Sequence, residues 1–172
     1  MALHPDEVLL AGERPFPALP AVDHYAGSEK MMLKALSMQQ VMGPIFDLTC
    51  DCEDGARAGA ETEHAQMVVA MVNSPDNHFG RVGTRIHDIT HPHWERDLEI
   101  LIGGAGKRLA FVTLPKVCSA ADAATQIAAL RQIEASSGLT RQLPVHVLIE
   151  THGALREAWE IAALDGVESL DF

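Results

Sequence analysis

The chain has 172 residues, of which 47% are hydrophobic and 22% charged, a composition typical of a folded globular protein with one sizeable core. It carries 13 Lys and Arg against 24 Asp and Glu, a formal net charge of -11 without any basic run, so we expect no nucleic-acid partner. No apolar stretch approaches the roughly 20 residues that cross a bilayer, and the N-terminus lacks a basic leader followed by an apolar block. We therefore expect no membrane partner and a cytoplasmic location.

The first twenty residues contain four prolines and little periodicity, which predicts an extended arm over residues 1–20. From residue 21 onward, short apolar runs of strand type alternate with amphipathic stretches of helical period. Strands are predicted over residues 21–25, 44–50, 81–86, 109–114, 145–149 and 167–172.

Five helices are predicted between and after these strands. The first begins at Ser28, the second spans 61–73, the third spans 93–102 and ends at Gly103-Gly104, and the fifth spans 151–164. The fourth starts with a capping box of Ser119 and Asp122 and closes at Gly138. The predicted buried stripes are Met31, Ala35, Met38 and Met42 in the first helix, Ala123, Ile127 and Leu130 in the fourth, and Leu155, Trp159 and Ala162 in the fifth.

The alternation of strands and helices predicts an α/β fold with a parallel sheet covered by helices. The first clear turn is acidic, whereas a doubly wound sheet usually carries a Gly-rich turn there. A (β/α)8 TIM barrel needs about 250 residues, and this chain supplies five βα units and the start of a sixth strand. We therefore predict an incomplete TIM-barrel catalytic domain over residues 21–172. Because an open barrel leaves strand edges unpaired, we expect the natural polypeptide to continue past Phe172, or another segment to complete the barrel.

Ionisable residues follow four consecutive predicted strands. The four ends carry, in chain order, Asp51 with Glu53 and Asp54, then Arg85 with His87 and Asp88, then Lys116, and then Glu150. The carboxyl ends of parallel strands meet at one rim, where α/β enzymes assemble their sites. Each residue also has a simpler interpretation: a turn for Asp54, a surface ion pair for Arg85, a solvated loop for Lys116 and a helix N-cap for Glu150. Their shared position favours one site, in which a cation, Arg85 and Lys116 neutralise the acidic cluster.

The chemistry of such a set suggests a metal enzyme. Hard carboxylate oxygens suit Mg2+, which takes one or two protein carboxylates and leaves places for substrate oxygens. A metal with an open position can bind a 2-oxo or hydroxy acid and stabilise an enolate as a carbon–carbon bond breaks or forms. Arg85 can bind a substrate carboxylate through two parallel hydrogen bonds. Lys116 can add positive charge or, if desolvated, act as a Schiff-base nucleophile.

Four motifs follow one another along the chain: Asp51-Cys52-Glu53-Asp54-Gly55-Ala56, Thr84-Arg85-Ile86-His87, Leu114-Pro115-Lys116 and Ile149-Glu150-Thr151-x-Gly153. In this order they resemble the elements D-L-E-D-[AG]-V, V-R-I-N, L-P-K and I-E-[ST]-x-x-G of the citrate lyase β-subunit and malyl-CoA lyase type of aldolase, the HpcH/HpaI aldolase family. Tyr25-Ala26-Gly27 with Lys30-Met31-Met32-x-Lys34-Ala35-Leu36 also resembles the family's opening V-P-G and K-M-L-x-K-A. The resemblance covers about residues 21 to 172.

This resemblance implies a TIM barrel that binds Mg2+ and cleaves or condenses a small hydroxy or oxo acid, often as a CoA thioester. It implies that Glu150 is a metal ligand and that Arg85 holds the substrate carboxylate. Glu53 and Asp54 would orient metal-bound water or substrate, with Lys116 in support. It also implies a homo-oligomer.

The resemblance has departures as well as matches. The family's second metal ligand would be an Asp beyond Phe172, since Asp171 comes too early. The V-R-I-N asparagine is His87, and the basic residue usually found before the opening strand is missing around Pro20-Ala21. The basic K-x-x-A-R element of the second helix is replaced by Glu61, Glu63 and Gln66. These losses weaken a CoA assignment most, because CoA phosphates favour basic contacts.

Two alternatives stay open at this stage: a metal-independent aldolase that uses Lys116 as the imine former, and a catalytically degenerate barrel that serves as a binding or assembly module.

The three cysteines, Cys50, Cys52 and Cys118, are expected to be reduced. For Cys50 and Cys52, a role as small buried side chains is favoured over a zinc or redox site. Three signals are discounted: the glycine-rich segment 103–107, the His91-Pro92-His93 pair, and the isolated His64, His146 and His152.

Overall fold

The computed structural model describes residues 19–20 and 22–172, so that most of the predicted N-terminal arm lies outside the described residues. Six strands form one sheet in the order β1-β2-β3-β4-β5-β6, and every neighbouring pair is parallel. The strands are β1 Asp23–Ala26, β2 Asp47–Asp51, β3 Val82–Arg85, β4 Val112–Leu114, β5 Val145–Leu148 and β6 Val167–Asp171. All six predicted strands are confirmed, with ends that differ by up to three residues.

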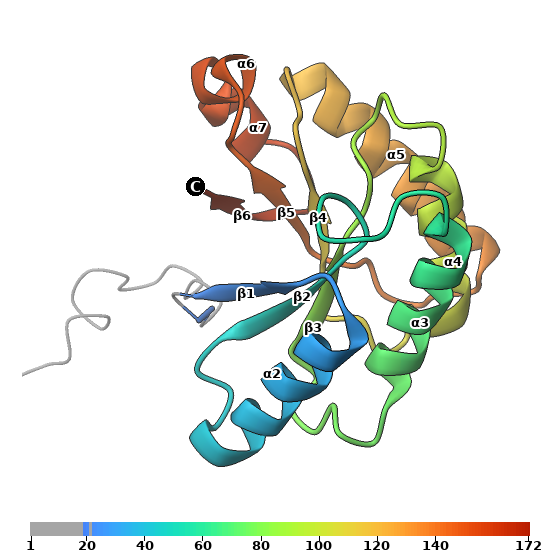
Figure 1. Ribbon diagram of the computed structural model, residues 1–172. Helices are drawn as coiled ribbons and strands as arrows, with labels where there is room; N and C mark the ends of the chain where they lie inside the picture. Colours follow the sequence, from blue (N-terminus) through green and yellow to red (C-terminus); the bar gives the residue numbers. More distant parts are fainter. Residues whose placement is uncertain (1–18, 21) are drawn as a thin grey trace, which may run out of the picture.

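The helices follow the strands and lie on the outer side of the curled sheet, as Figure 1 shows. They are α2 Glu29–Met42, α3 Glu61–Asn73, α4 Trp94–Ala105, α5 Ala120–Ser136, α6 His152–Arg156 and α7 Ala158–Ala162. The predicted α/β class with a parallel sheet is confirmed, and the sheet is a curled half-barrel of six strands. All helices in the described part of the chain fall short of the length and apolarity that a bilayer-spanning segment requires.

Side-chain alternation along the strands separates an apolar face from a polar one. In β2, Leu48 and Cys50 are fully buried members of the hydrophobic core, which also takes in Leu98 and Ile102 of α4. The alternate residues Asp47, Thr49 and Asp51 are polar and make contacts across the other face. The concave side of the sheet is therefore lined by hydrogen-bonding and charged groups, which the apolar layer under the helices holds in position.

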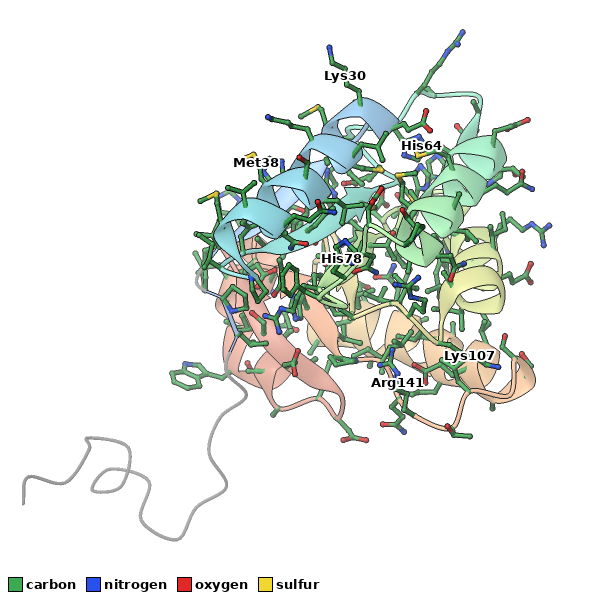
Figure 2. All side chains as sticks on the ribbon, turned by 90° about the horizontal axis from the view of Figure 1, so that it is seen from below. Lys30, Met38, His64, His78, Lys107 and Arg141 are labelled. Carbon is green, nitrogen blue, oxygen red and sulfur yellow. The ribbon has the colours of Figure 1, made fainter. Side chains whose placement is uncertain are left out.

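The predicted buried stripe of the first helix is wrong for its methionines. In α2 the exposed fractions are 49% for Met31, 41% for Met38 and 49% for Met42, and Figure 2 shows Met38 on the outside of the molecule. The buried residues are Met32, Ala35, Leu36 and Gln39. Apolar residues surround more than half of this helix, so two stripes fit the helical period equally well. Gln39 decides the packing in part, because its amide nitrogen donates to the Phe46 carbonyl at 2.9 Å.

The predicted fifth helix is two short helices, α6 and α7, separated at Glu157. Its predicted stripe is wrong, since Leu155 is 61% and Trp159 87% exposed, while Ala154 and Ile161 are buried. The glycine stop proposed for the third helix is wrong as well, because α4 continues through Gly103 and Gly104 to Ala105. An isolated pair of glycines weakens a helix without ending it when the flanking residues pack.

The fourth helix agrees with its prediction in both cap and stripe. The Ser119 hydroxyl accepts from the amide of Asp122 at 3.1 Å, and the Asp122 carboxylate accepts from the amide of Cys118 at 2.9 Å. Ala123, Ile127 and Leu130 are buried. These reciprocal contacts fix the loop between β4 and α5, which carries Lys116.

Candidate functional site

The loops after β1 and β2 touch at the carboxyl end of the sheet. A Cβ atom on Gly27 would lie 2.2 Å from the Gly55 carbonyl oxygen, and one on Gly55 would lie 2.5 Å from an Asp51 carboxylate oxygen. Both positions therefore require glycine for close backbone approach rather than for an unusual φ angle. This contact places the acidic loop 51–56 directly over the end of the first strand.

Asp51 and Arg85 form a bidentate ion pair at the ends of β2 and β3. Arg85 Nε and Nη2 donate to the two Asp51 carboxylate oxygens at 2.8 and 2.6 Å, and both side chains are almost completely buried. Asp51 also accepts from the amides of Glu53 and Gly55. Burial opposes the charge of Asp51, but the hydrogen bonds from Arg85 and these amides outweigh it and lower the pKa of the carboxyl. Asp51 is thus an ionised support for Arg85 and for the loop, a role that the sequence alone did not identify.

Glu53 lies between two cations. Its carboxylate oxygens are 3.2 Å from Arg85 Nη1 and 2.9 Å from Lys116 Nζ. Both oxygens are therefore ion-paired, and neither has a hydrogen-bond partner among the described residues. Burial raises the pKa of Glu53, and Lys116 and Arg85 limit that rise. A buried carboxylate with unsatisfied oxygens can still accept a proton or contact a ligand.

Lys116 joins three of the predicted residues through both its side chain and its backbone. Its Nζ donates to Asp54 at 2.8 Å and pairs with Glu53, and its amide donates to a Glu150 carboxylate oxygen at 2.8 Å. The hydrogen bond to Asp54 and the close contact with Glu53 stabilise the ammonium group and raise the pKa of Lys116. Its φ of +50° lies in the left-handed region, where a non-glycine residue is uncommon and often marks a functional site.

Glu150 is exposed at the end of β5, and the simpler interpretation that it caps the next helix is wrong. The N-cap is Thr151, whose hydroxyl accepts from the amide of Ala154 and donates to the Val117 carbonyl. Of the two carboxylate oxygens of Glu150, only Oε1 accepts a hydrogen bond from the described residues. Its second oxygen is therefore available for a metal ion, and the carboxylates of Glu53 and Asp54 reach the same lysine.

The five predicted residues Glu53, Asp54, Arg85, Lys116 and Glu150 are thus connected by direct contacts at one rim of the sheet. Beside them lies a pocket of about 310 Å³ whose lining includes Glu53, Asp54, Lys116, Arg57, His87 and His91. Glu53 and Asp54 in this lining, and Glu150, which lies outside it, offer carboxylate oxygens of the kind that a hard cation such as Mg2+ prefers. The functional roles of these residues stay predictions.

His87, which the sequence places after the third strand, forms a buried pair with Asp97, a partner that the sequence analysis did not identify. His87 Nδ1 lies 2.5 Å from the Asp97 carboxylate, whose residue is fully buried in α4, and the imidazole stacks on His91 with ring centroids 3.9 Å apart. Burial disfavours the imidazolium, but the Asp97 carboxylate outweighs it and raises the pKa of His87. The sequence offered one indication of this pair, because Asp97 is an acidic residue at a helix position that should face the core.

The expectation of reduced cysteines with two buried side chains is confirmed. Cys50 and Cys52 are free thiols exposed by no more than 1%, and Cys118 is a free, exposed thiol. Burial raises the pKa of Cys50 to about 12 and that of Cys52 well above its ordinary value. Such thiols are poor nucleophiles and poor metal ligands.

A parallel half-barrel with acidic and basic side chains gathered at the carboxyl ends of its strands is the arrangement in which barrel enzymes assemble their sites. Residues 24–172 match the HpcH/HpaI aldolase/citrate lyase family, and the chain belongs to this family. The predicted resemblance is thereby confirmed. An L-malyl-CoA/beta-methylmalyl-CoA lyase of Cereibacter sphaeroides is 31% identical over 118 residues, which are 67% of this chain and 36% of that protein.

Solved structures agree with this assignment. A citrate lyase from Burkholderia xenovorans LB400 has a TM-score of 0.85 and 48% identity, over 90% of this chain and 48% of that one. CitE of Mycobacterium tuberculosis, in complex with magnesium and pyruvate, has a TM-score of 0.58 and 22% identity, over 91% of this chain and 55% of that one, and shares the fold. The chain spans about half the length of the Burkholderia structure and a little over a third of the curated lyase.

Proposed function

We propose that this chain forms part of a Mg2+-dependent carbon–carbon lyase that acts on a small hydroxy or oxo acid, free or as its CoA thioester. The observation that carries the proposal is the contact network of Lys116 with Glu53, Asp54 and Glu150 at the rim. Family membership and the similarity to a malyl-CoA lyase and a citrate lyase support the reaction class.

Glu150 is the proposed metal ligand, because it offers a free carboxylate oxygen whose partner oxygen the Lys116 amide holds in place. When bound, Mg2+ would polarise a substrate carbonyl and stabilise negative charge on the neighbouring carbon. The magnesium complex of CitE shows a shared fold at 22% identity, so the proposal depends on the oxygen donors of this chain. A second ligand, an Asp beyond Phe172, is part of the proposal.

Arg85 is proposed to bind the substrate carboxylate. Its guanidinium has five N–H groups, of which three face Asp51 and Glu53. The others can donate to a carboxylate, and the ion pair with Asp51 fixes their direction before substrate binds. Preorganised donors of this kind lose little freedom on binding.

Glu53 and Asp54 are proposed to orient water or substrate and to exchange a proton with it. Burial raises the pKa of Glu53, which brings the carboxyl closer to the range in which a side chain can both accept and return a proton. Lys116 is proposed to support them by keeping both carboxylates in position and by balancing their charge.

The remaining parts of the proposal concern the whole protein. They are the closure of an eight-unit barrel, assembly into a homo-oligomer and a cytoplasmic location. Whether a CoA thioester or a free acid is the substrate is decided by the experiment below.

The structure gives a physical argument against the Schiff-base alternative. Imine formation needs a neutral amine, but ion pairs with Asp54 and Glu53 raise the pKa of Lys116 and stabilise its charged form. We therefore favour a supporting role for this lysine.

The test compares the variants Glu150→Gln and Glu160→Gln in the protein that carries this chain, with malyl-CoA, citrate and oxaloacetate as substrates. Glu160 is exposed on α7, so its variant controls for the loss of one negative charge. We expect EDTA to abolish activity, Mg2+ to restore it, and Glu150→Gln to lower kcat/KM by at least about 100-fold. Mn2+ binding followed by electron paramagnetic resonance should weaken in Glu150→Gln only. Unchanged metal binding and turnover in that variant would contradict the proposal, and metal binding without turnover of any substrate would favour a binding module.

A further inference from the structure

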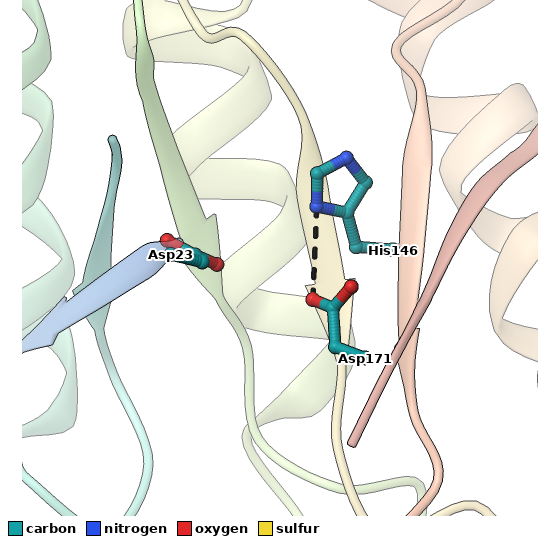
Figure 3. Close-up of side chains that lie close together, drawn as sticks. All are labelled: Asp23, His146 and Asp171. Atoms are coloured by element: carbon teal, nitrogen blue, oxygen red, sulfur yellow. Dashed lines mark ion pairs between the residues drawn. The ribbon is translucent and has the colours of Figure 1, made fainter. Parts of the chain in front are cut away.

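A second group of potential ligands lies on the concave side of the sheet, on strands that are far apart in sequence. Asp23 on β1, His146 on β5 and Asp171 on β6 each place one ligand atom within 4.8 Å of the others. Figure 3 shows the three side chains converging from these strands. They line a cavity of about 450 Å³ that shares no lining residue with the pocket beside Lys116.

The imidazole of His146 is held firmly but is incompletely bonded. It is buried, and it stacks on Phe111 with ring centroids 4.0 Å apart. Its Nε2 lies 3.3 Å from a Glu168 carboxylate oxygen, whereas its Nδ1 is buried with no hydrogen-bond partner among the described residues. Asp171 Oδ2 is 3.8 Å from Nδ1, close enough for an ion pair but too far for a hydrogen bond, and it is also buried without a hydrogen-bond partner in the described part of the chain.

A proton on Nε2, directed at Glu168, leaves a lone pair on Nδ1. That lone pair faces a carboxylate oxygen, and two acceptors cannot satisfy each other. The two orphan atoms therefore point to a positively charged species between them. A buried polar group without a partner is rare enough in native proteins to require such an explanation.

Glu168 reaches the imidazole because of an irregularity in the sheet. Val145 pairs with Val167, but His146 pairs with Ser169, so Glu168 is the extra residue of a bulge between β5 and β6. A carboxylate that accepts from the outer nitrogen of a histidine commonly orients that histidine toward a metal. The bulge thus supplies the outer partner that a histidine ligand needs.

The two aspartates are also oriented, and they are short of positive charge. The Thr49 hydroxyl donates to Asp23, and the Ser169 hydroxyl donates to Asp171 at 2.6 Å. No Lys or Arg among the described residues forms an ion pair with Asp23 or Asp171.

We propose that Asp23, His146 and Asp171 form a metal site for a Zn2+-class transition ion, separate from the Mg2+ site proposed at Glu150. One imidazole nitrogen and two carboxylate oxygens select such an ion over Mg2+, which prefers oxygen alone. Tetrahedral zinc ligands are about 3.3 Å apart, so small side-chain rotations from the present spacing suffice. The ion would link β1, the first strand, to β5 and β6 across the concave side of the curled sheet.

The test uses the protein that carries this chain, freed of metal and titrated with Zn2+ against a competing chelator, and with Co2+ for its absorption spectrum. The variants are His146→Gln, Asp171→Asn and Glu168→Gln. Controls are His24→Gln, an exposed histidine on β1, and Glu150→Gln at the other proposed site. We expect one zinc equivalent whose affinity falls at least about 100-fold in the two ligand variants and about 10- to 100-fold in Glu168→Gln. Both control variants should bind one zinc equivalent with the affinity of the unaltered protein.

A second measurement on the unaltered protein keeps the test informative if a variant fails to fold. The nitrogen-15 resonance of His146 Nδ1 should move to a metal-bound value when Zn2+ is added. A Nδ1 resonance that stays that of a protonated imidazolium, or zinc affinity that is the same in Asp171→Asn as in the unaltered protein, would overturn the proposal. Loss of activity in Glu150→Gln with zinc binding intact would show that the two sites are independent.

Discussion

The buried ion pair between Asp51 and Arg85 predicts a large cost for the variant Asp51→Asn. The exposed fractions are 4% for Asp51 and 9% for Arg85, and removing one partner of a buried pair typically costs about 3–5 kcal/mol. Glu53, at 3.2 Å from the guanidinium, offsets part of the lost charge. We therefore expect a loss of about 3 kcal/mol in the free energy of unfolding, a large share of the roughly 5–15 kcal/mol of an ordinary domain.

Urea unfolding followed by circular dichroism measures this cost. Asp165→Asn is the matched control, because Asp165 is exposed and makes no ion pair among the described residues. The double variant Asp51→Asn with Arg85→Gln should cost less than the sum of the single changes, since it leaves no uncompensated charge. A loss below about 1 kcal/mol for Asp51→Asn, or full additivity, would refute the reasoning.

The lowered pKa of Asp51 fixes the pH dependence of this effect. A carboxyl whose pKa is lower in the folded state stabilises the fold above its unfolded pKa of about 3.9. This stabilisation is lost as the pH falls through the folded pKa. The stability difference between the unaltered protein and Asp51→Asn should therefore be constant near neutral pH and shrink in the acid range below about pH 4.

Three further predictions concern single positions. Gly27→Ala should lower stability by about 1–3 kcal/mol, because its Cβ would meet backbone atoms of the next loop, whereas Gly103→Ala in α4 meets nothing within 4 Å and should gain about 0.5–1 kcal/mol in urea unfolding. Because the pKa of His87 is raised in the folded state, the stabilisation that it contributes should be fully present below about pH 6.5 and be lost as the pH rises through the folded pKa. Proton NMR titration should show a lower pKa of His87 in Asp97→Asn, and an unchanged pKa would exclude Asp97 as the cause. Borohydride treatment with pyruvate should add no mass at Lys116, whose amine is held in its charged form, and a trapped adduct there would restore the Schiff-base mechanism.

The arrangement of the rim was predictable from the sequence because it follows from one rule. Parallel strands end on the same side, so residues after successive strands, such as Glu53, Arg85 and Lys116, must share one edge. Local patterning could not choose the buried face of α2, since its apolar residues fit two stripes and the location of the sheet decides between them. It also could not predict the break between α6 and α7.

The Asp23, His146 and Asp171 group was missed for a different reason. Asp23 is more than 100 positions from His146 and Asp171, and only the curl of the sheet brings the first strand near the fifth and sixth. His146 was dismissed because no partner stands at a useful spacing along the chain. Spacing predicts ligand sets within a loop or helix but not those formed when a sheet curls.

The left-handed backbone at Lys116 has a consequence for mutational scanning. This position contributes a main-chain donor to Glu150 as well as an ammonium group to Asp54. Substitution by alanine removes only the ammonium group and keeps the main-chain donor. Glycine would also keep the main-chain donor, and it would remove the steric strain that a side chain causes at a φ of +50°. Proline, whose ring fixes φ near −65° and which has no N–H, would remove both at once. A survey limited to alanine would therefore underestimate how much this residue contributes to the rim.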